Sequence, residues 1–209
     1  MYLGGLCFIT DRRSGDLTYE EMCLAVLRSG VKWIQYRDKD RTRGEFYNEA
    51  LMLRRVTRDF NAILVINDHS DIAIAVDADG VHLGQDDLPL KEARRIMGRD
   101  RIIGISTHSL EQAIEAERGG ADYIGFGPLF HTITKDAGAP RGISMLREVK
   151  EKVHIPVIAI GGINLTNLES VLDAGADAIA VATGILKGDI TENTNRFMDI
   201  IRKRKWQCQ

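Results

Sequence analysis

Eight short hydrophobic runs recur along the chain, and longer segments with a different spacing of hydrophobic residues separate them. The runs are mostly continuous and rich in β-branched residues, which is typical of strands buried on both faces of a parallel sheet. The separating segments follow the helical period, as Phe46, Ala50 and Leu53 do at positions i, i+4 and i+7. The eight runs are GLCFITD, WIQYRDK, AILVIND, GVHLGQ, IIGISTH, YIGFGPLF, PVIAIGG and AIAVATGI.

Residues with defined roles at helix ends mark where the expected helices begin and end. Four Ser or Thr residues are followed three positions later by Glu or Gln, which is the spacing of a capping box at a helix N-terminus. In three places a glycine stands just before a hydrophobic run, where a helix C′ residue belongs. The capping pairs are Thr18 and Glu21, Thr42 and Glu45, Ser109 and Gln112, and Thr166 and Glu169, and the glycines are Gly30, Gly120 and Gly175.

One pattern, an amphipathic segment followed by a small residue and a β-branched run, repeats in RSGVKWIQYR, AVDADGVHLG, RGGADYIGFG and DAGADAIAVA. Eight strands that alternate with helices in 209 residues indicate an α/β fold, a compact (β/α)8 TIM barrel. We expect a single domain over residues 1–209, because this length suits one sizeable core better than two. The alternative, an open doubly wound sheet, lacks support because no G-x-G-x-x-G follows the first run.

The overall charge and the cysteines narrow the class of protein. A formal net charge of −2 gives no reason to expect a nucleic acid or an anionic membrane as partner, and the basic residues 202–205 fit the last turn of a helix. No hydrophobic run approaches the roughly 18 residues that span a bilayer, and the first residues lack the features of a signal peptide. Cys7, Cys23 and Cys208 have no paired spacing, so we expect free thiols in the cytoplasm.

Polar residues follow several of the runs, and in a barrel these positions meet on the one face where active sites lie. Carboxylates at Asp68 and Asp87 and cations at Arg37, Lys39 and Lys135 come together there. Oxygen ligands hold Mg²⁺ and cations neutralise the remaining phosphate charge, so this combination suggests a diphosphate bound through Mg²⁺. The neighbouring polar residues are Gln35, Asn67, Gln85, Asp86, Ser106, Thr107, His108, Thr132 and Thr134.

Small residues end the last two runs, at Gly161-Gly162 and Ala182-Thr183-Gly184. Loops at these places in barrels commonly hold a phosphate on backbone N–H groups, and small side chains let the phosphate approach. Two anion sites, one with a metal and one without, fit an enzyme that joins a diphosphate substrate to a monophosphate substrate.

Seven segments together resemble the thiamine-phosphate synthase (thiamine-phosphate pyrophosphorylase) family. They are QYRDK, NDH, DGVHLGQDDLP, GISTHS, DYIGFGPLFHTITKDAG, IPVIAIGGIN and AGADAIAVATGI. The resemblance runs from the first hydrophobic run to the eighth, and GPLFHTITK and HLGQDDLP are its most specific parts. It implies a transferase of thiamine biosynthesis with two small phosphorylated heterocyclic substrates. A pyrimidine diphosphate and a thiazole phosphate would give thiamine phosphate and pyrophosphate, in a dissociative substitution assisted by Mg²⁺.

The resemblance also implies roles for individual residues. Arg37, Lys39 and Lys135 would be catalytic, because they would stabilise the leaving pyrophosphate. Asp68 and Asp87 would bind Mg²⁺. The residues implied for the pyrimidine diphosphate are Gln35, Tyr36, Arg37, Asp38, Lys39, Asn67, Ser106 and Lys135. Those implied for the thiazole phosphate are Thr132, Ile133, Thr134, Gly162, Ala182 and Thr183.

The chain departs from the family pattern at four of its positions. Tyr36 and Asp38 stand where many relatives carry Leu and Glu, and we expect these changes to alter packing only. His131 stands where Pro is frequent, in a loop over residues 131–141 that we expect to be mobile and to close over bound substrates. Thr183 stands where Ser is frequent and keeps the hydroxyl group.

The remaining aromatic and histidine positions carry weaker expectations. We expect His82, which lies inside a strand, to be a hydrogen-bonded core residue rather than a ligand, and Trp33 and Trp206 to serve packing. His69 and His108 lie at the active face, where they either orient neighbours or are turn residues. His154 receives no function, and no pair of histidines has the helical spacing of a zinc site.

Other functions are open on this sequence. A thiazole tautomerase-like isomerase would bind only the thiazole phosphate and would not need five charged residues at the strand ends. A non-catalytic regulatory barrel that binds phosphate, or an unrelated phosphate-binding isomerase, are further alternatives. Barrels of this kind are often dimers, so a homodimer is one possible assembly.

Overall fold

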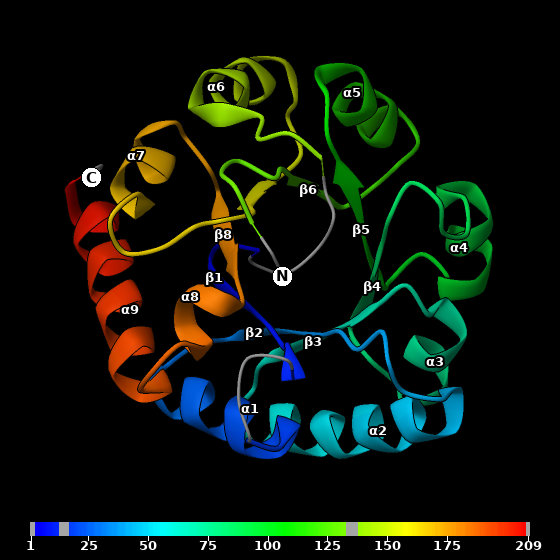
Figure 1. The fold of residues 1–209 in the computed structure, drawn as a ribbon. Helices are drawn as coiled ribbons and strands as arrows, with labels where there is room; N and C mark the ends of the chain where they lie inside the picture. The colour runs from blue at the N-terminus through cyan, green and yellow to red at the C-terminus, as the bar shows by residue number, and fades with distance from the viewer. Residues whose placement is uncertain (1–2, 13–16, 133–137, 208–209) are drawn as a thin grey trace.

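The computed structural model describes residues 3–12, 17–132 and 138–207, and it shows eight parallel strands that close into a barrel inside a ring of helices (Figure 1). Each strand pairs with its neighbours in the sequence, and β1 pairs with β8 to close the barrel. The strands are β1 (Gly5–Ile9), β2 (Trp33–Tyr36), β3 (Ile63–Asn67), β4 (Gly80–Leu83), β5 (Ile102–Thr107), β6 (Tyr123–Phe126), β7 (Val157–Ile160) and β8 (Ala178–Val181). The predicted (β/α)8 barrel is confirmed, and the open doubly wound sheet is excluded.

Helices follow every strand and cover the outside of the barrel (Figure 1). The long last helix contacts the first one, so the helical ring closes where the barrel does. The helices are α1 (Tyr19–Arg28), α2 (Arg43–Asp59), α3 (Ser70–Ala75), α4 (Leu90–Met97), α5 (Leu110–Arg118), α6 (Gly142–Lys152), α7 (Leu168–Asp173), α8 (Thr183–Leu186) and α9 (Ile190–Gln207).

The predicted helix starts are confirmed at three of four places. Thr18 and Thr42 form complete capping boxes at the starts of α1 and α2, and the Ser109 hydroxyl accepts a hydrogen bond from the backbone of α5. The prediction at Thr166 is wrong, because α7 begins only at Leu168. There the Asn164 carboxamide accepts hydrogen bonds from both the N–H and the hydroxyl of Thr166, which holds Thr166 in a turn.

The predicted helix ends are confirmed at three glycines. Gly30, Gly120 and Gly175 follow the C-caps of α1, α5 and α7 and have φ values of +94°, +86° and +90°. This left-handed conformation favours glycine because it has no Cβ, so the chain can turn from each helix directly into the next strand.

Side chains fill the barrel interior. Trp33 and Tyr123 form an edge-to-face pair inside the barrel with ring centroids 5.1 Å apart, and Cys7 is buried beside them. The packing role predicted for Trp33 is therefore confirmed, whereas the side chain of Trp206 lies outside the described residues. Burial raises the pKa of the thiols of Cys7 and Cys23, both of which are free; Cys208 lies outside the described residues.

The amino ends of the strands carry a repeated arrangement that the sequence analysis missed. In three places an aspartate stands just before an even-numbered strand. Its carboxylate accepts a hydrogen bond from the N–H of the first or second residue of the preceding strand. It also forms an ion pair with an Arg or Lys on an even-numbered helix. The sets are Asp79 with Leu64 and Arg54, Asp122 with Ile103 and Arg94, and Asp177 with Val157 and Lys150. We call these three sets the aspartate clamps. Lys32 stands at the corresponding place before β2.

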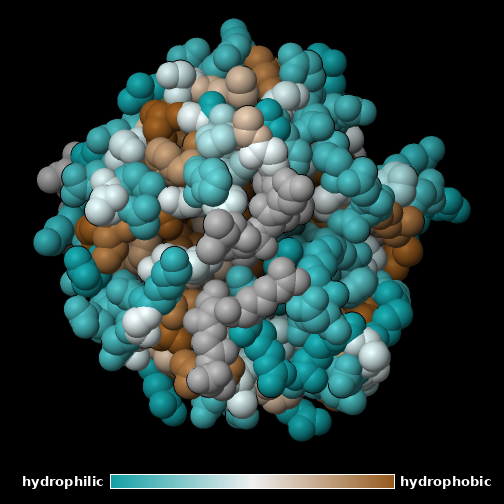
Figure 2. Space-filling model, viewed as in Figure 1, coloured by the Kyte–Doolittle hydropathy of each residue, from teal (hydrophilic) through white to brown (hydrophobic). Residues whose placement is uncertain are grey.

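The surface is mostly hydrophilic, and hydrophobic residues lie in small separate groups on the face in Figure 2. Of the large hydrophobic side chains in the described ranges, Leu17, Leu88 and Ile96 are exposed. Across those same residues, no helix combines the length and the hydrophobicity that crossing a membrane requires. The basic stretch at residues 202–205 does lie in the last part of α9, as predicted, and Arg204 there pairs with Asp173 of α7.

Candidate active site

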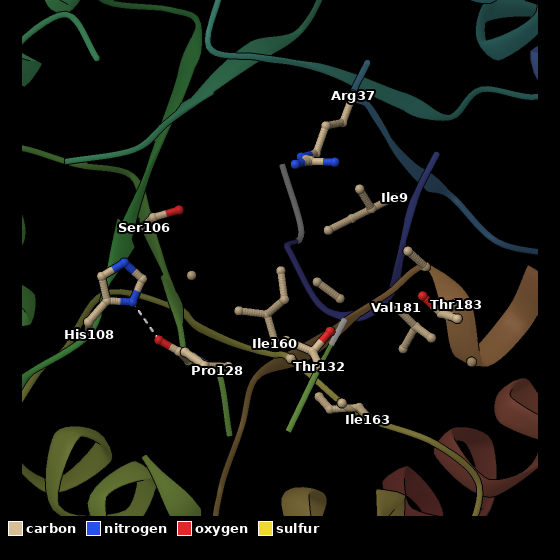
Figure 3. Close-up of a pocket in the computed structure, with 17 residues that line it drawn as sticks. Ile9, Arg37, Ser106, His108, Pro128, Thr132, Ile160, Ile163, Val181 and Thr183 are labelled. Carbon is tan, nitrogen blue, oxygen red and sulfur yellow. Dashed lines mark hydrogen bonds between the residues drawn. The ribbon is translucent and has the colours of Figure 1, made fainter. Parts of the chain in front are cut away.

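A pocket of about 140 Å³ opens at the carboxyl ends of the strands. Ile9 and Ile160 supply hydrophobic surface, and Arg37, Ser106 and Thr183 supply polar groups from different sides (Figure 3). The pocket lies where the sequence analysis placed the active face, because the strands are parallel and all end at this side.

The side chain of Thr10, just after β1, positions the backbone of Arg37, just after β2. The Arg37 N–H donates to the Thr10 hydroxyl at 2.9 Å, and the same hydroxyl donates to the Arg37 carbonyl at 3.0 Å. Deeper in the barrel, the Gln35 carboxamide donates to the Asn67 carboxamide oxygen at 3.1 Å, and both side chains are almost fully buried. The Arg37 side chain thus enters the pocket from a backbone held by Thr10, and the hydrogen-bonded pair of Gln35 and Asn67 lies beneath it.

Two carboxyl groups meet from the loops after β3 and β4, at the same end of the barrel but outside the lining of this pocket. Asp68 has a left-handed backbone with φ +66°, and its N–H donates to the His82 carbonyl at 2.8 Å. Asp87 is held by the Gly84 N–H, which donates to its Oδ2 at 2.6 Å. The two carboxyl groups lie within hydrogen-bonding reach of each other, and the Lys39 ammonium forms an ion pair with Asp68.

The pKa values of the two carboxyl groups shift in opposite directions. Burial raises the pKa of Asp87, and the neighbouring Asp68 carboxylate raises it further. Burial also acts to raise the pKa of Asp68, but the hydrogen bonds from Lys39 and Asp87 outweigh burial and lower it. Two adjacent carboxyls that compete for a proton are a suitable oxygen pair for a hard cation. Among the described residues no cluster of three or more His, Cys, Asp or Glu side chains could hold a metal, so a cation here would need further oxygens from water or a ligand.

Small residues form the opposite wall, between β7 and α8. Gly161 and Gly162 have φ values of +94° and +67°, and a Cβ at Gly162 would lie 2.5 Å from the His131 carbonyl oxygen. Ala182 and Thr183 line the same wall at the start of α8, and Thr132 approaches from the loop after β6 (Figure 3). Both glycines line the pocket, and the absence of a Cβ lets the chain pack closely against the segment after β6.

Two residues of the QYRDK segment lie outside the pocket. Tyr36 is fully buried between the rings of Tyr19 and Phe46, at centroid distances of 5.1 and 4.3 Å. The Asp38 carboxylate accepts hydrogen bonds from the Tyr19 hydroxyl and from the Asp40 N–H. These side chains pack against the helices, so a ligand could meet only the backbone at these two positions.

Three of the expected site residues, Ile133, Thr134 and Lys135, lie in the segment 133–137, outside the described residues, and their roles stay predictions. Asp86, expected as a charged neighbour of Asp87, is exposed.

The histidines differ in their surroundings. His82 is buried with both ring nitrogens in hydrogen bonds, which confirms the prediction of a satisfied core residue. His108 lines the pocket, and its Nδ1 lies 2.6 Å from the Gly127 carbonyl oxygen. His69 packs its ring on Phe46 at 4.9 Å, and the backbone of His154 contacts Glu117. Ile9 and Thr10 were not predicted as site residues, although the polar Thr10 follows the first hydrophobic run just as the predicted site residues follow theirs.

Comparisons with known proteins agree on one family. The family model described as thiamine monophosphate synthase matches residues 6–185. The chain is 46% identical over 191 residues to the thiamine-phosphate synthase of Halalkalibacterium halodurans, with 91% of this chain and 90% of that protein covered. It is 48% identical over 197 residues to the thiamine-phosphate synthase of Caldanaerobacter subterraneus subsp. tengcongensis, covering 93% of this chain and 92% of the relative.

A solved structure is similar over nearly the full length. The thiamine phosphate pyrophosphorylase from Pyrococcus furiosus superposes with a TM-score of 0.88 at 40% identity, with 95% of this chain and 96% of that chain covered. The thiamine phosphate pyrophosphorylase from Bacteroides thetaiotaomicron, at 20% identity and a TM-score of 0.68, shows the shared fold.

Proposed function

Because the chain belongs to the thiamine monophosphate synthase family and is a transferase, we propose that it joins 4-amino-2-methyl-5-hydroxymethylpyrimidine diphosphate to 4-methyl-5-(2-phosphooxyethyl)thiazole. The products would be thiamine phosphate and pyrophosphate. One observation carries the proposal, namely that a single pocket has a wall at Arg37 and a small-residue wall at Gly162, while the Lys39, Asp68 and Asp87 cluster lies on the loops that follow β2, β3 and β4 at the same end of the barrel. The two walls suit a diphosphate and a monophosphate, respectively.

Mg²⁺ is the cation we propose for the carboxyl pair of Asp68 and Asp87. The donor set fits, because Mg²⁺ prefers carboxylate oxygens and usually completes its shell with water and substrate phosphate oxygens. When bound, Mg²⁺ would neutralise charge on the diphosphate. Lys39, whose ammonium lies at Asp68, would add a second positive charge at the same place.

The chemistry requires a stabilised leaving group more than a base. The carbon–oxygen bond to the diphosphate breaks, and its electron pair leaves with pyrophosphate. The pyrimidinylmethyl cation that remains is stabilised by the ring amino group, and the thiazole nitrogen then supplies the electron pair of the new carbon–nitrogen bond. Arg37, Lys39 and Lys135 would hold the departing charge, and a preorganised contact of this kind contributes about 10²–10³ in rate.

The thiazole phosphate would lie against the small-residue wall. Gly162 lines this wall with backbone alone, and the Thr183 and Thr132 hydroxyls can donate to phosphate oxygens. The hydrophobic surface of Ile9 and Ile160 between the walls would receive the two heterocycles. Their reacting atoms would then meet in the middle of the pocket, away from both phosphate groups.

Incubation of the purified protein with both substrates and Mg²⁺ tests the proposal. Thiamine phosphate and pyrophosphate should form in equal amounts, and omission of either substrate should abolish both. A tautomerase-like isomerase would instead convert a thiazole phosphate in the absence of the diphosphate. Absence of thiamine phosphate in the complete mixture would contradict the proposed function.

A further inference from the structure

Three side chains form a hydrogen-bonded line from the barrel interior to the pocket. The Tyr123 hydroxyl lies 2.9 Å from Nδ1 of His82, and Nε2 of His82 lies 2.9 Å from Oγ of Ser106. Tyr123 and His82 are buried, whereas Ser106 lines the pocket and its hydroxyl oxygen points toward the open space (Figure 3). The three residues come from β6, β4 and β5, so the line crosses three adjacent strands.

The barrel interior is shaped to accommodate this line. A Cβ at Gly104 would lie 2.0 Å from the ring of Tyr123, and a Cβ at Gly125 would lie 3.0 Å from the ring of His82. The Tyr123 ring is also stacked on His82, with centroids 5.5 Å apart, and held on another side by Trp33. Two glycines and an aromatic neighbour thus fix where both rings lie.

The direction of each hydrogen bond follows from the surroundings of Tyr123. Its hydroxyl makes one hydrogen bond with the described residues, to His82, so its proton has Nδ1 as acceptor. A neutral imidazole that accepts at Nδ1 carries its proton on Nε2 and donates it to the Ser106 oxygen. The Ser106 proton is then directed away from His82 and into the pocket. Burial also raises the pKa of Tyr123 well above its ordinary value, so the hydroxyl keeps its proton at neutral pH.

We propose that Tyr123 and His82 are positioning residues that hold the Ser106 hydroxyl as a hydrogen-bond donor toward an acceptor atom of the bound pyrimidine diphosphate. The inference rests on the proposed function for the identity of that ligand, but the state of His82 does not depend on it. Without the Tyr123 hydroxyl, His82 could carry its proton on Nδ1, and Ser106 would turn its proton toward the unprotonated Nε2. The substrate would then lose its donor although Ser106 itself is unchanged.

The first test is the protonation state of His82 in the folded, ligand-free protein. Long-range ¹H–¹⁵N spectra of the ¹⁵N-labelled chain should show the His82 ring protonated at Nε2, with the resonance assigned through its loss in His82→Gln. Tyr123→Phe should reduce the Nε2-protonated fraction, whereas Tyr47→Phe, at a half-buried position of α2, should leave it unchanged. A native His82 protonated at Nδ1 would overturn the inference whatever the enzyme's activity.

The second test separates positioning from general stabilisation. With the thiazole phosphate saturating, Tyr123→Phe should raise the KM for the diphosphate by about threefold to tenfold, the effect of one hydrogen bond. The KM for the thiazole phosphate should not change. In a Ser106→Ala background, Tyr123→Phe should have no further effect on the diphosphate KM. An equal loss in both backgrounds would show a merely structural role. Absence of product from the parental enzyme would instead count against the proposed function and leave the spectroscopic test decisive.

Discussion

The carboxyl groups of Asp68 and Asp87 reach each other across the loops that follow β3 and β4, and the Lys39 ammonium is paired with Asp68. Without a cation, this arrangement is costly because two negative groups lie together in a partly buried place. The raised pKa of Asp87 expresses that cost. A divalent cation bound between the two carboxylates would remove the repulsion between them, and it would also attract the phosphate groups of a substrate.

The carboxyl pair makes activity depend on Mg²⁺ and on both aspartates. Excess chelator should abolish turnover, and Asp68→Asn or Asp87→Asn should raise the Mg²⁺ concentration for half-maximal activity by about tenfold or more, because each removes one of two anionic ligands. Asp86→Asn is the matched control, since Asp86 is exposed and adjacent in sequence. Full turnover with excess chelator would refute the metal site.

Thr183 should matter to one substrate only. Thr183→Val keeps the shape of the side chain and removes the hydroxyl, so the KM for the thiazole phosphate should rise about tenfold or more while the KM for the diphosphate stays the same. Thr183→Ser should restore most of the loss. Gly162→Val is a less selective test, because its Cβ would also collide with the His131 carbonyl. Equal losses for both substrates in Thr183→Val would show that the pocket is not divided into two anion sites.

Lys135 should act on the chemical step. Lys135→Ala should lower kcat by a factor on the order of 10² or more, with a smaller change in the affinity for the diphosphate, because the leaving pyrophosphate gains charge only as the bond breaks. Single-turnover rates with both substrates saturating measure that step. Lys152→Ala, at an exposed position of α6, is the control. A parental single-turnover rate in Lys135→Ala would exclude Lys135 from the transition state.

Asp38 should contribute stability rather than catalysis. Burial acts to raise the pKa of Asp38, but hydrogen bonds from Tyr19 and from two backbone N–H groups outweigh burial and lower it. A carboxyl with a lower pKa in the folded state stabilises the fold above the ordinary aspartate range, and this stabilisation is lost as the pH falls through the folded-state pKa. Asp38→Asn should therefore reduce the free energy of unfolding at neutral pH by about 1–3 kcal/mol, and by less in acid.

Denaturant unfolding at several pH values measures this difference, with Asp100→Asn at an exposed position as the control. The folded Asp38→Asn protein should keep kcat and both KM values close to the parental ones. A large selective loss in diphosphate affinity would contradict the packing role.

The aspartate clamps should also be separable from activity. Asp122→Ala removes the partner of both Arg94 and the Ile103 N–H, whose hydrogen bonds measure 2.6 and 2.7 Å. The free energy of unfolding should fall by about 1–3 kcal/mol, while the kinetic constants at a temperature well below the unfolding transition stay unchanged. Thermal unfolding with activity measured in parallel tests this, and a loss of activity without a loss of stability would contradict it.

The sequence predicts the barrel well because its information is local and periodic. The continuous runs mark the strands, and Gly30 or Thr18 marks a helix end through one backbone conformation or one hydrogen bond. The prediction at Thr166 is wrong because its hydroxyl donates to the Asn164 carboxamide instead of capping a helix. The spacing of Thr and Glu alone does not reveal this alternative hydrogen bond.

The sequence predicts those site residues that stand at the carboxyl end of a strand, because the barrel brings all of these ends together. The period of two along β2 sends Gln35 and Arg37 inward and Tyr36 outward, so motif residues that are adjacent in sequence separate in space. The line from Tyr123 through His82 to Ser106 joins three strands, and it depends on glycines that only the closed barrel brings opposite the rings. No short-range pattern carries that information.

The aspartate clamps stabilise the amino ends of the strands, whereas the pocket lies at the carboxyl ends. They fasten the amino ends of β3, β5 and β7 with one carboxylate, one backbone amide and one cation each, far along the strands from the pocket. Such a molecule can exchange a threonine for a serine, or rebuild a loop, and alter its chemistry while its architecture persists. Stabilising contacts at the amino ends of the strands leave the carboxyl ends available for the pocket.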